Sequence, residues 1–126
     1  MNFGSDNVYG VHPAVMDAIV AANSGTQASY GSDEFTRRAQ DQLCDLFECK
    51  LDAFLVLTGT AANSLCLSAM VPPYGAIVCH GDAHILVDEC GAPELFTGGA
   101  KLIGINDPLG KLQPGSIEKV LDGFVR

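Results

Sequence analysis

The stretch from Phe54 to Asn63 constrains the fold of this chain more than any other part of the sequence. It opens with four consecutive apolar residues, 54–57, which are typical of a short buried strand. A Thr-Gly-Thr turn at residues 58–60 follows, and a run of good helix formers comes next. Such a turn is suited to bind an anion, because the first N–H groups of a helix lack intrahelical partners and lie at the positive end of its dipole.

Gly59 and Thr60 are therefore the first candidate binding residues. A glycine lets a phosphate approach the backbone, and the hydroxyl of Thr60 can donate a hydrogen bond to it. The turn has neither the lysine of a Walker A loop nor the GxGxxG pattern of a dinucleotide site. An ordinary strand-to-helix turn with a threonine cap fits the same residues, so the motif alone leaves both interpretations open.

Helical and strand patterns alternate along the chain, which predicts the α/β class with a mostly parallel sheet and flanking helices. Residues 85–96 are a less regular case, because Gly91 and Pro93 interrupt their helical pattern. Ser32 is the expected N-cap of the second helix. The expected helices cover residues 13–24, 33–47, 61–70 and 114–122, and the expected strands cover residues 54–57, 75–79 and 101–105.

The composition narrows the class of protein. The chain has 126 residues, 48% of them apolar, which suits a domain-sized unit with a core. Its formal charge of −8 argues against nucleic acid and anionic membranes as partners. We see neither an apolar run long enough to span a membrane nor the pattern of a signal peptide. The five cysteines are odd in number and form no C-x-x-C pair, so we expect reduced thiols in a cytoplasmic protein.

Titratable side chains crowd into residues 79–90, after the second expected strand. Ligands of open α/β sheets bind beyond the carboxyl ends of the strands, so this segment and the turn at 58–60 are expected to share one edge. A metal site of His80, Asp82 and His84 is one interpretation, although the spacing matches no standard zinc pattern. A polar loop with one buried, hydrogen-bonded histidine is another. We favour a third, without metal, in which the His84 ring stacks on an aromatic cofactor whose phosphate lies at that turn.

Five short motifs run through nearly the whole chain: Ser5-Asp6-Asn7, Tyr30-Gly31, Thr58-Gly59-Thr60-Ala61-Ala62-Asn63, Ala83-His84, and Asp88-Glu89-Cys90-Gly91-Ala92-Pro93-Glu94. Each is short, but their combination, order and spacing are specific. With them the sequence resembles an N-terminal segment of the low-specificity L-threonine and phenylserine aldolases, which use pyridoxal phosphate.

The resemblance implies the fold type I, aminotransferase-like architecture, whose large domain holds a mostly parallel sheet between helices. Residues 1–25 would be the N-terminal arm and helix, and residues 26–126 the N-terminal part of the large domain that binds pyridoxal phosphate. The rest of that domain and the C-terminal small domain would follow residue 126. Active sites of the family lie at subunit interfaces, which implies a homo-oligomer, either a dimer or a tetramer.

The same resemblance implies roles for single residues. In the family, the residues that match Gly59 and Thr60 hold the cofactor phosphate, and the ring that matches His84 stacks on the pyridine. Ser5 would help to bind the substrate carboxylate. Tyr30 would approach the site from the neighbouring subunit.

Two residues are candidates for the catalytic base that removes the substrate's hydroxyl proton. One is His84, since a ring nitrogen can take a proton while the ring face stacks. The other is Glu89, whose counterpart is a candidate for proton transfer through a water. Some relatives carry an aromatic residue at the position of Asp88, which leaves the shape of the side-chain pocket open.

The activity implied is cleavage of β-hydroxy-α-amino acids, such as threonine and phenylserine, to glycine and an aldehyde. The family's Schiff-base lysine lies beyond residue 126, and the lysines of this chain do not match its context. We therefore expect the chain to need the remainder of the aldolase polypeptide and to be inactive alone. Two alternatives stay open: a β-eliminating pyridoxal-phosphate lyase of the same fold, and a non-catalytic fragment that serves as an assembly surface.

Overall fold

The computed structural model describes residue 4 and residues 8–124. The chain divides into two compact units, residues 1–53 and residues 54–126. The predicted division after residue 25 rests on the layout of the resembling family and stays a prediction. None of the helices in the described part of the chain is long and apolar enough to cross a membrane.

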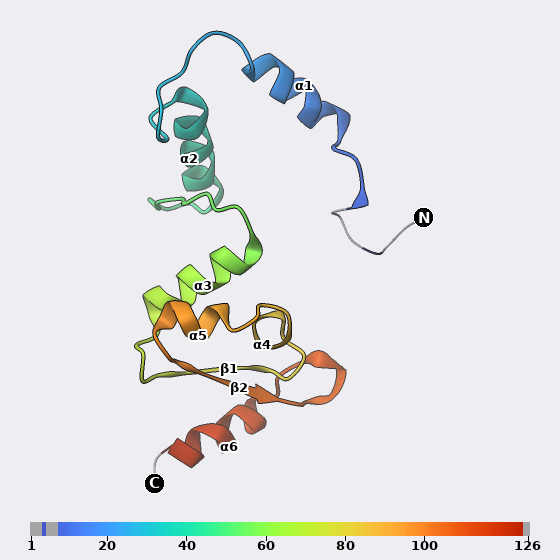
Figure 1. The fold of residues 1–126 in the computed structure, drawn as a ribbon, viewed down its shortest axis with the longest axis vertical. Coiled ribbons are helices and arrows are strands. Elements are labelled where there is room, and N and C mark those ends of the chain that lie inside the picture. Colours follow the sequence, from blue (N-terminus) through green and yellow to red (C-terminus); the bar gives the residue numbers. More distant parts are fainter. Residues whose placement is uncertain (1–3, 5–7, 125–126) are drawn as a thin grey trace. The chain divides into compact units, whose positions relative to one another are not determined.

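The first helix of the first unit is α1 (Pro13–Ala22) (Figure 1). Pro13 suits the first helical position, because its missing N–H would have no intrahelical partner there. The ring of His12 caps the helix by accepting a hydrogen bond from the backbone N–H of Ala14 at 3.2 Å. The predicted start of this helix is confirmed, and its end lies two residues before the predicted one.

The second helix of this unit is α2 (Glu34–Leu46). Its cap is Asp33, so the prediction of Ser32 is wrong by one residue. Asp33 is the better cap because its carboxylate accepts two hydrogen bonds from Thr36, one from the backbone N–H at 2.8 Å and one from the hydroxyl at 2.7 Å.

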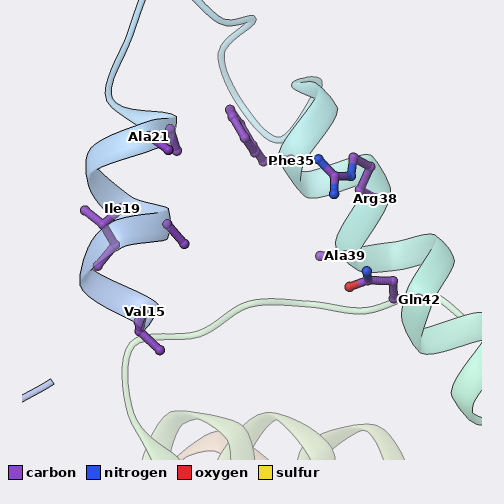
Figure 2. A pocket seen from close by; sticks show the side chains of 9 residues that line it. Val15, Ile19, Ala21, Phe35, Arg38, Ala39 and Gln42 are labelled. Carbon is purple, nitrogen blue, oxygen red and sulfur yellow. The ribbon is translucent and has the colours of Figure 1, made fainter. Parts of the chain in front are cut away.

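An apolar groove of about 570 Å³ lies between α1 and α2 (Figure 2). The apolar stripes that the sequence predicts on the two helices both contribute to it. None of the predicted site residues lines this groove. Its lining includes Val15, Ile19, Phe35, Arg38, Ala39 and Gln42.

The second unit is built on two parallel strands, in which Ala76 pairs with Lys101 and His80 with Ile105. The predicted range of the later strand is confirmed, and that of the earlier one is shifted by one residue. Figure 1 shows α3, α4 and α5 on one side of the strands and α6 on the other. The elements of this unit are α3 (Gly59–Met70), β1 (Ala76–His80), α4 (His84–Val87), α5 (Ala92–Thr97), β2 (Lys101–Ile105), the short 3-10 turn η2 (Pro108–Gly110) and α6 (Pro114–Phe124).

The connection between β1 and β2 explains the irregular pattern at residues 85–96. Gly91 has a φ of 76°, a left-handed conformation that favours glycine, and it separates α4 from α5. Pro93 occupies the second position of α5, where a helix needs no N–H donor. The two residues therefore divide the segment into two short helices.

The predicted strand at residues 54–57 is wrong, because these residues form no strand in the structure. Phe54 is 85% exposed and Leu57 is 100% exposed. A strand is defined by hydrogen bonds to a neighbour, and only β1 and β2 pair among the described residues. An apolar run shows a tendency to be buried, but it does not identify a pairing partner.

The interior of the second unit is small and partly polar. Its buried apolar residues within the described part of the chain are Cys79, Pro93 and Ala100. Thr97 is also buried, and its hydroxyl donates to the carbonyl of Pro93 at 2.8 Å and accepts from the N–H of Ala100 at 3.1 Å. The other buried polar residues, Ser64 and Glu89, lie near the packed helices α3 and α5 and lead to the candidate site.

Candidate active site

The turn at Thr58 is the start of α3, with Gly59 and Thr60 as the first two helical residues. The side chain of Thr58 caps the helix by accepting a hydrogen bond from the N–H of Ala61 at 3.1 Å. The backbone N–H of Ala62 donates to the Thr58 carbonyl at 3.1 Å. The N–H groups of Gly59 and Thr60 have no acceptor among the described residues, which leaves them available to an anion.

Two further features make this helix start suitable for an anion. The first turn of α3 contains no acidic side chain that would repel one. Apart from its chain neighbours and its own helix backbone, a Cβ placed on Gly59 would have no heavy atom of the described residues within 4 Å, so the space beside this glycine is open.

A hydrogen-bond chain connects α3 to the loop between β1 and α5. The side-chain Nδ2–H of Asn63 donates to Oε1 of Glu89 at 2.7 Å. The same Glu89 oxygen lies 2.9 Å from Nδ1 of His84. The side chain of His84 is 65% exposed, whereas that of Glu89 is 0% exposed. A buried carboxylate therefore holds a histidine ring whose other side faces outward.

The carboxyl group of Glu89 has a pKa below its ordinary value. Burial raises this pKa, but hydrogen bonds from Asn63 and His84, together with the electrostatic attraction of the His84 ring, outweigh the effect of burial. Glu89 is therefore ionised at neutral pH and can only accept hydrogen bonds. Nδ1 of His84 must then carry the proton, and Nε2 of a neutral ring is left with the lone pair that a base needs.

His80 has a different environment from His84. Its Nδ1 accepts a hydrogen bond from the N–H of Asp82 at 3.1 Å, and its Nε2–H donates to the carbonyl of Asp107 at 2.8 Å. Only 12% of its side chain is exposed. His80 is thus a half-buried, hydrogen-bonded histidine at the end of β1, and its environment differs from that of the exposed His84 ring.

The structure groups some of the predicted site residues and leaves others apart. Gly59, Thr60, His84 and Glu89 lie in the second unit and are connected through α3. Tyr30 lies in the first unit, fully exposed and with a φ of 61°. Ser5 lies outside the described residues. In the part of the chain that the structure describes, no three side chains of histidine, cysteine, aspartate or glutamate are arranged to hold a metal ion.

Asn63 is the site residue to which sequence reasoning assigned no role. In the sequence, Asn63 is simply the last residue of the motif at residues 58–63. Its spacing from Gly59 is the one feature that could have indicated a role. Asn63 follows Gly59 by four residues, which places both on the same face of a helix. The bond to Glu89 crosses 26 residues of sequence and cannot be read from local patterns.

Comparison with known proteins gives consistent matches. The profile of the beta-eliminating lyase family matches residues 2–124. The low specificity L-threonine aldolase of Pseudomonas aeruginosa is 43% identical over 118 residues, and that of a second Pseudomonas strain is 44% identical. Each match covers 94% of this chain and 34% of the relative, so the chain spans about a third of the length of these curated relatives.

The solved structure of a Leishmania major threonine aldolase has a similar fold. It superposes with a TM-score of 0.83 at 29% identity, over 92% of this chain and 34% of that protein. The likeness confirms the predicted α/β class and the fold type I architecture. The predicted resemblance to threonine aldolases is likewise confirmed.

Proposed function

Because the chain belongs to the beta-eliminating lyase family, we propose that it is part of a pyridoxal-phosphate-dependent threonine aldolase. The whole polypeptide would cleave β-hydroxy-α-amino acids, such as threonine and phenylserine, to glycine and an aldehyde. The identity of 43% to a low specificity L-threonine aldolase supports this choice within the family. The observation that carries it is the pair formed by His84 and the buried Glu89, joined to the anion-binding end of α3 by hydrogen bonds.

The residues present fit pyridoxal phosphate. Gly59 and Thr60 would hold its phosphate, since their N–H groups are without acceptors in the described structure and the space beside Gly59 is open. The exposed ring of His84 would cover one face of the pyridine. When bound, the cofactor supplies a ring that takes up electrons from the bond that breaks.

We assign the proton transfer to His84. Its Nε2 would accept the proton of the substrate's β-hydroxyl as the carbon–carbon bond breaks. Glu89 would stabilise the positive charge that then forms on the ring, because its carboxylate lies 2.9 Å from Nδ1. Since the Glu89 side chain is fully enclosed, we assign it a positioning role rather than direct contact with substrate.

The remaining roles concern groups beyond this site. Ser5 would bind the substrate carboxylate, and Tyr30 would reach the site of a neighbouring copy in a homo-oligomer, either a dimer or a tetramer. The remainder of the aldolase polypeptide would supply the lysine that bonds to the cofactor. A cytoplasmic location is supported by the absence of disulfides among the described cysteines.

The test is an assay of the complete polypeptide that carries this chain. With pyridoxal phosphate and L-threonine, we expect glycine and acetaldehyde in equal amounts. His84→Asn should lower kcat roughly 100- to 10,000-fold, the usual effect of losing a general base. A β-eliminating activity, with an oxo acid and ammonia as products and no aldehyde, would replace the aldolase proposal by the other lyase of this fold.

A further inference from the structure

We propose that Asn63 is a positioning residue, which ties the anion-binding end of α3 to the His84 ring through the Glu89 carboxylate. The proposal rests on the proposed function for the chemistry that His84 performs. The hydrogen bonds themselves are a property of the structure alone.

The connection runs through one carboxylate oxygen. Asn63 follows Gly59 by four residues, which is about 6 Å along the axis of α3. Its Nδ2–H donates to Oε1 of Glu89 at 2.7 Å. The same oxygen accepts the Nδ1–H of His84, the first residue of α4, at 2.9 Å. A change at Asn63 can therefore reach His84 without any direct contact between the two.

The groups around Glu89 explain why an uncharged hydrogen-bond donor at residue 63 suits this carboxylate. The other carboxylate oxygen, Oε2, is buried and has no partner within the described structure. Among the elements packed around it, α3 has no charged side chain, α5 contributes Glu94 and α4 contributes His84. An amide at Asn63 donates to Oε1 without adding a second negative charge. Its loss would leave a buried carboxylate with a single hydrogen bond.

Loss of the Asn63 donor should disturb the position of the His84 ring more than it disturbs the binding of substrate. The Glu89 carboxylate would be free to rotate, and the ring that it holds would rotate with it. Because small errors in the position of a reacting group can cost about 100-fold in rate, we expect Asn63→Ala to lower kcat roughly 10- to 100-fold. KM should change less, since the described hydrogen bond of the Asn63 side chain goes to Glu89 and not to the helix start at Gly59 and Thr60.

The first test measures the His84 ring directly, in the cofactor-free complete polypeptide. Nitrogen NMR of labelled histidine should show the Nδ1–H form of His84 in the parent protein, and this signal should shift or broaden in Asn63→Ala as the ring loses its fixed position. Ser68→Ala is the matched control on α3, because the Ser68 hydroxyl donates to the Leu65 carbonyl of the same helix and lies outside the Asn63–Glu89–His84 chain of hydrogen bonds. Asn63→Asp keeps the shape of the side chain and replaces its donor by a carboxylate, so it should also shift or broaden the signal.

The second test is a double-mutant cycle on kcat. If Asn63 acts through Glu89, then Asn63→Ala should change kcat less than about twofold in a Glu89→Gln background. Independent, multiplying effects of the two substitutions would overturn the proposal. An unchanged His84 signal in both Asn63 variants would overturn it as well.

The two proposals can fail separately. If the complete polypeptide cleaves no β-hydroxy amino acid, the proposed function fails. The NMR comparison still decides whether Asn63 controls His84, since it requires neither substrate nor cofactor. If aldolase activity is present and Asn63→Asp retains the rate and the His84 signal of the parent, only the role of Asn63 is wrong.

Discussion

The pairing of Glu89 with His84 shows which features of the site a sequence can predict. Both residues were candidates because titratable groups follow an apolar strand, and the structure brings them within 2.9 Å. Local spacing could not separate His84 from His80, four residues earlier. That difference depends on the Asp107 carbonyl, which binds His80 from 27 residues away. Partners distant in sequence decide which histidine is structural and which faces solvent.

The pKa of Glu89 leads to a prediction about acid stability. Its folded pKa is lowered, so the ionised form stabilises the fold above the ordinary value near 4.5, and this contribution is lost as pH falls through the lower folded pKa. In the complete polypeptide, Glu89→Gln should therefore reduce the free energy of unfolding at pH 7, and the difference should shrink below about pH 4.5.

Urea denaturation of the parent and of Glu89→Gln at pH 7 and pH 4 measures the difference in the free energy of unfolding at each pH. Glu118→Gln is the control, because Glu118 is exposed on α6. A difference between Glu89→Gln and the parent that stays constant over this pH range would contradict the prediction.

At the scale of elements, the patterns predict β1, β2 and the starts of α1 and α6 well, because these depend on local features. Pro13 and Pro114 each mark a first helical position, and a short apolar run gives each strand. The failure at residues 54–57 has a different cause. Strand formation requires a neighbour in space, and the described residues include none for this run. The fold class survives the loss of one strand because the β1–β2 pair is parallel and is connected by helices.

The close approach of Gly104 to its neighbours in the second unit predicts the effect of adding a methyl group there. A Cβ on Gly104 of β2 would lie 2.7 Å from a methyl carbon of Leu86 and 3.2 Å from the Cα of Gly81. Since the Gly81 backbone cannot move aside easily, Gly104→Ala should lower the free energy of unfolding by about 1–3 kcal/mol.

Gly115→Ala is the matched control, because a Cβ at Gly115 in α6 would meet no heavy atom of the described residues within 4 Å outside its chain neighbours and its own helix backbone. This variant should be neutral or stabilise the protein by up to about 1 kcal/mol. Urea denaturation of both variants in the complete polypeptide measures the contrast. Equal stability of the two variants would show that Gly104 does not approach Leu86 and Gly81 as closely as described.

At the scale of the whole molecule, the chain exposes large apolar side chains that a complete domain would cover. Phe54, Leu55 and Leu57 are 85%, 82% and 100% exposed. The chain also spans about a third of the length of its curated relatives. We propose that the remainder of the aldolase polypeptide covers these apolar side chains.

The last prediction concerns what this chain can do without that remainder. Gly59, Thr60 and His84 can position pyridoxal phosphate, but covalent attachment requires a deprotonated lysine held against its aldehyde. The chain has four lysines, Lys50, Lys101, Lys111 and Lys119, and all are exposed to solvent rather than enclosed in a site that could hold one of them against the aldehyde. The isolated chain should therefore bind the cofactor without a specific covalent bond and should cleave no threonine.

Reduction with borohydride in the presence of pyridoxal phosphate, followed by peptide mapping, measures the attachment. We expect substoichiometric labelling spread over several lysines, whereas the complete polypeptide should be labelled at one lysine beyond residue 126. His84→Ala in the isolated chain should leave that scattered labelling unchanged, because His84 supplies no amine. Stoichiometric labelling of one of the four lysines, together with cleavage of threonine, would instead show that this third of the fold carries a complete catalytic centre.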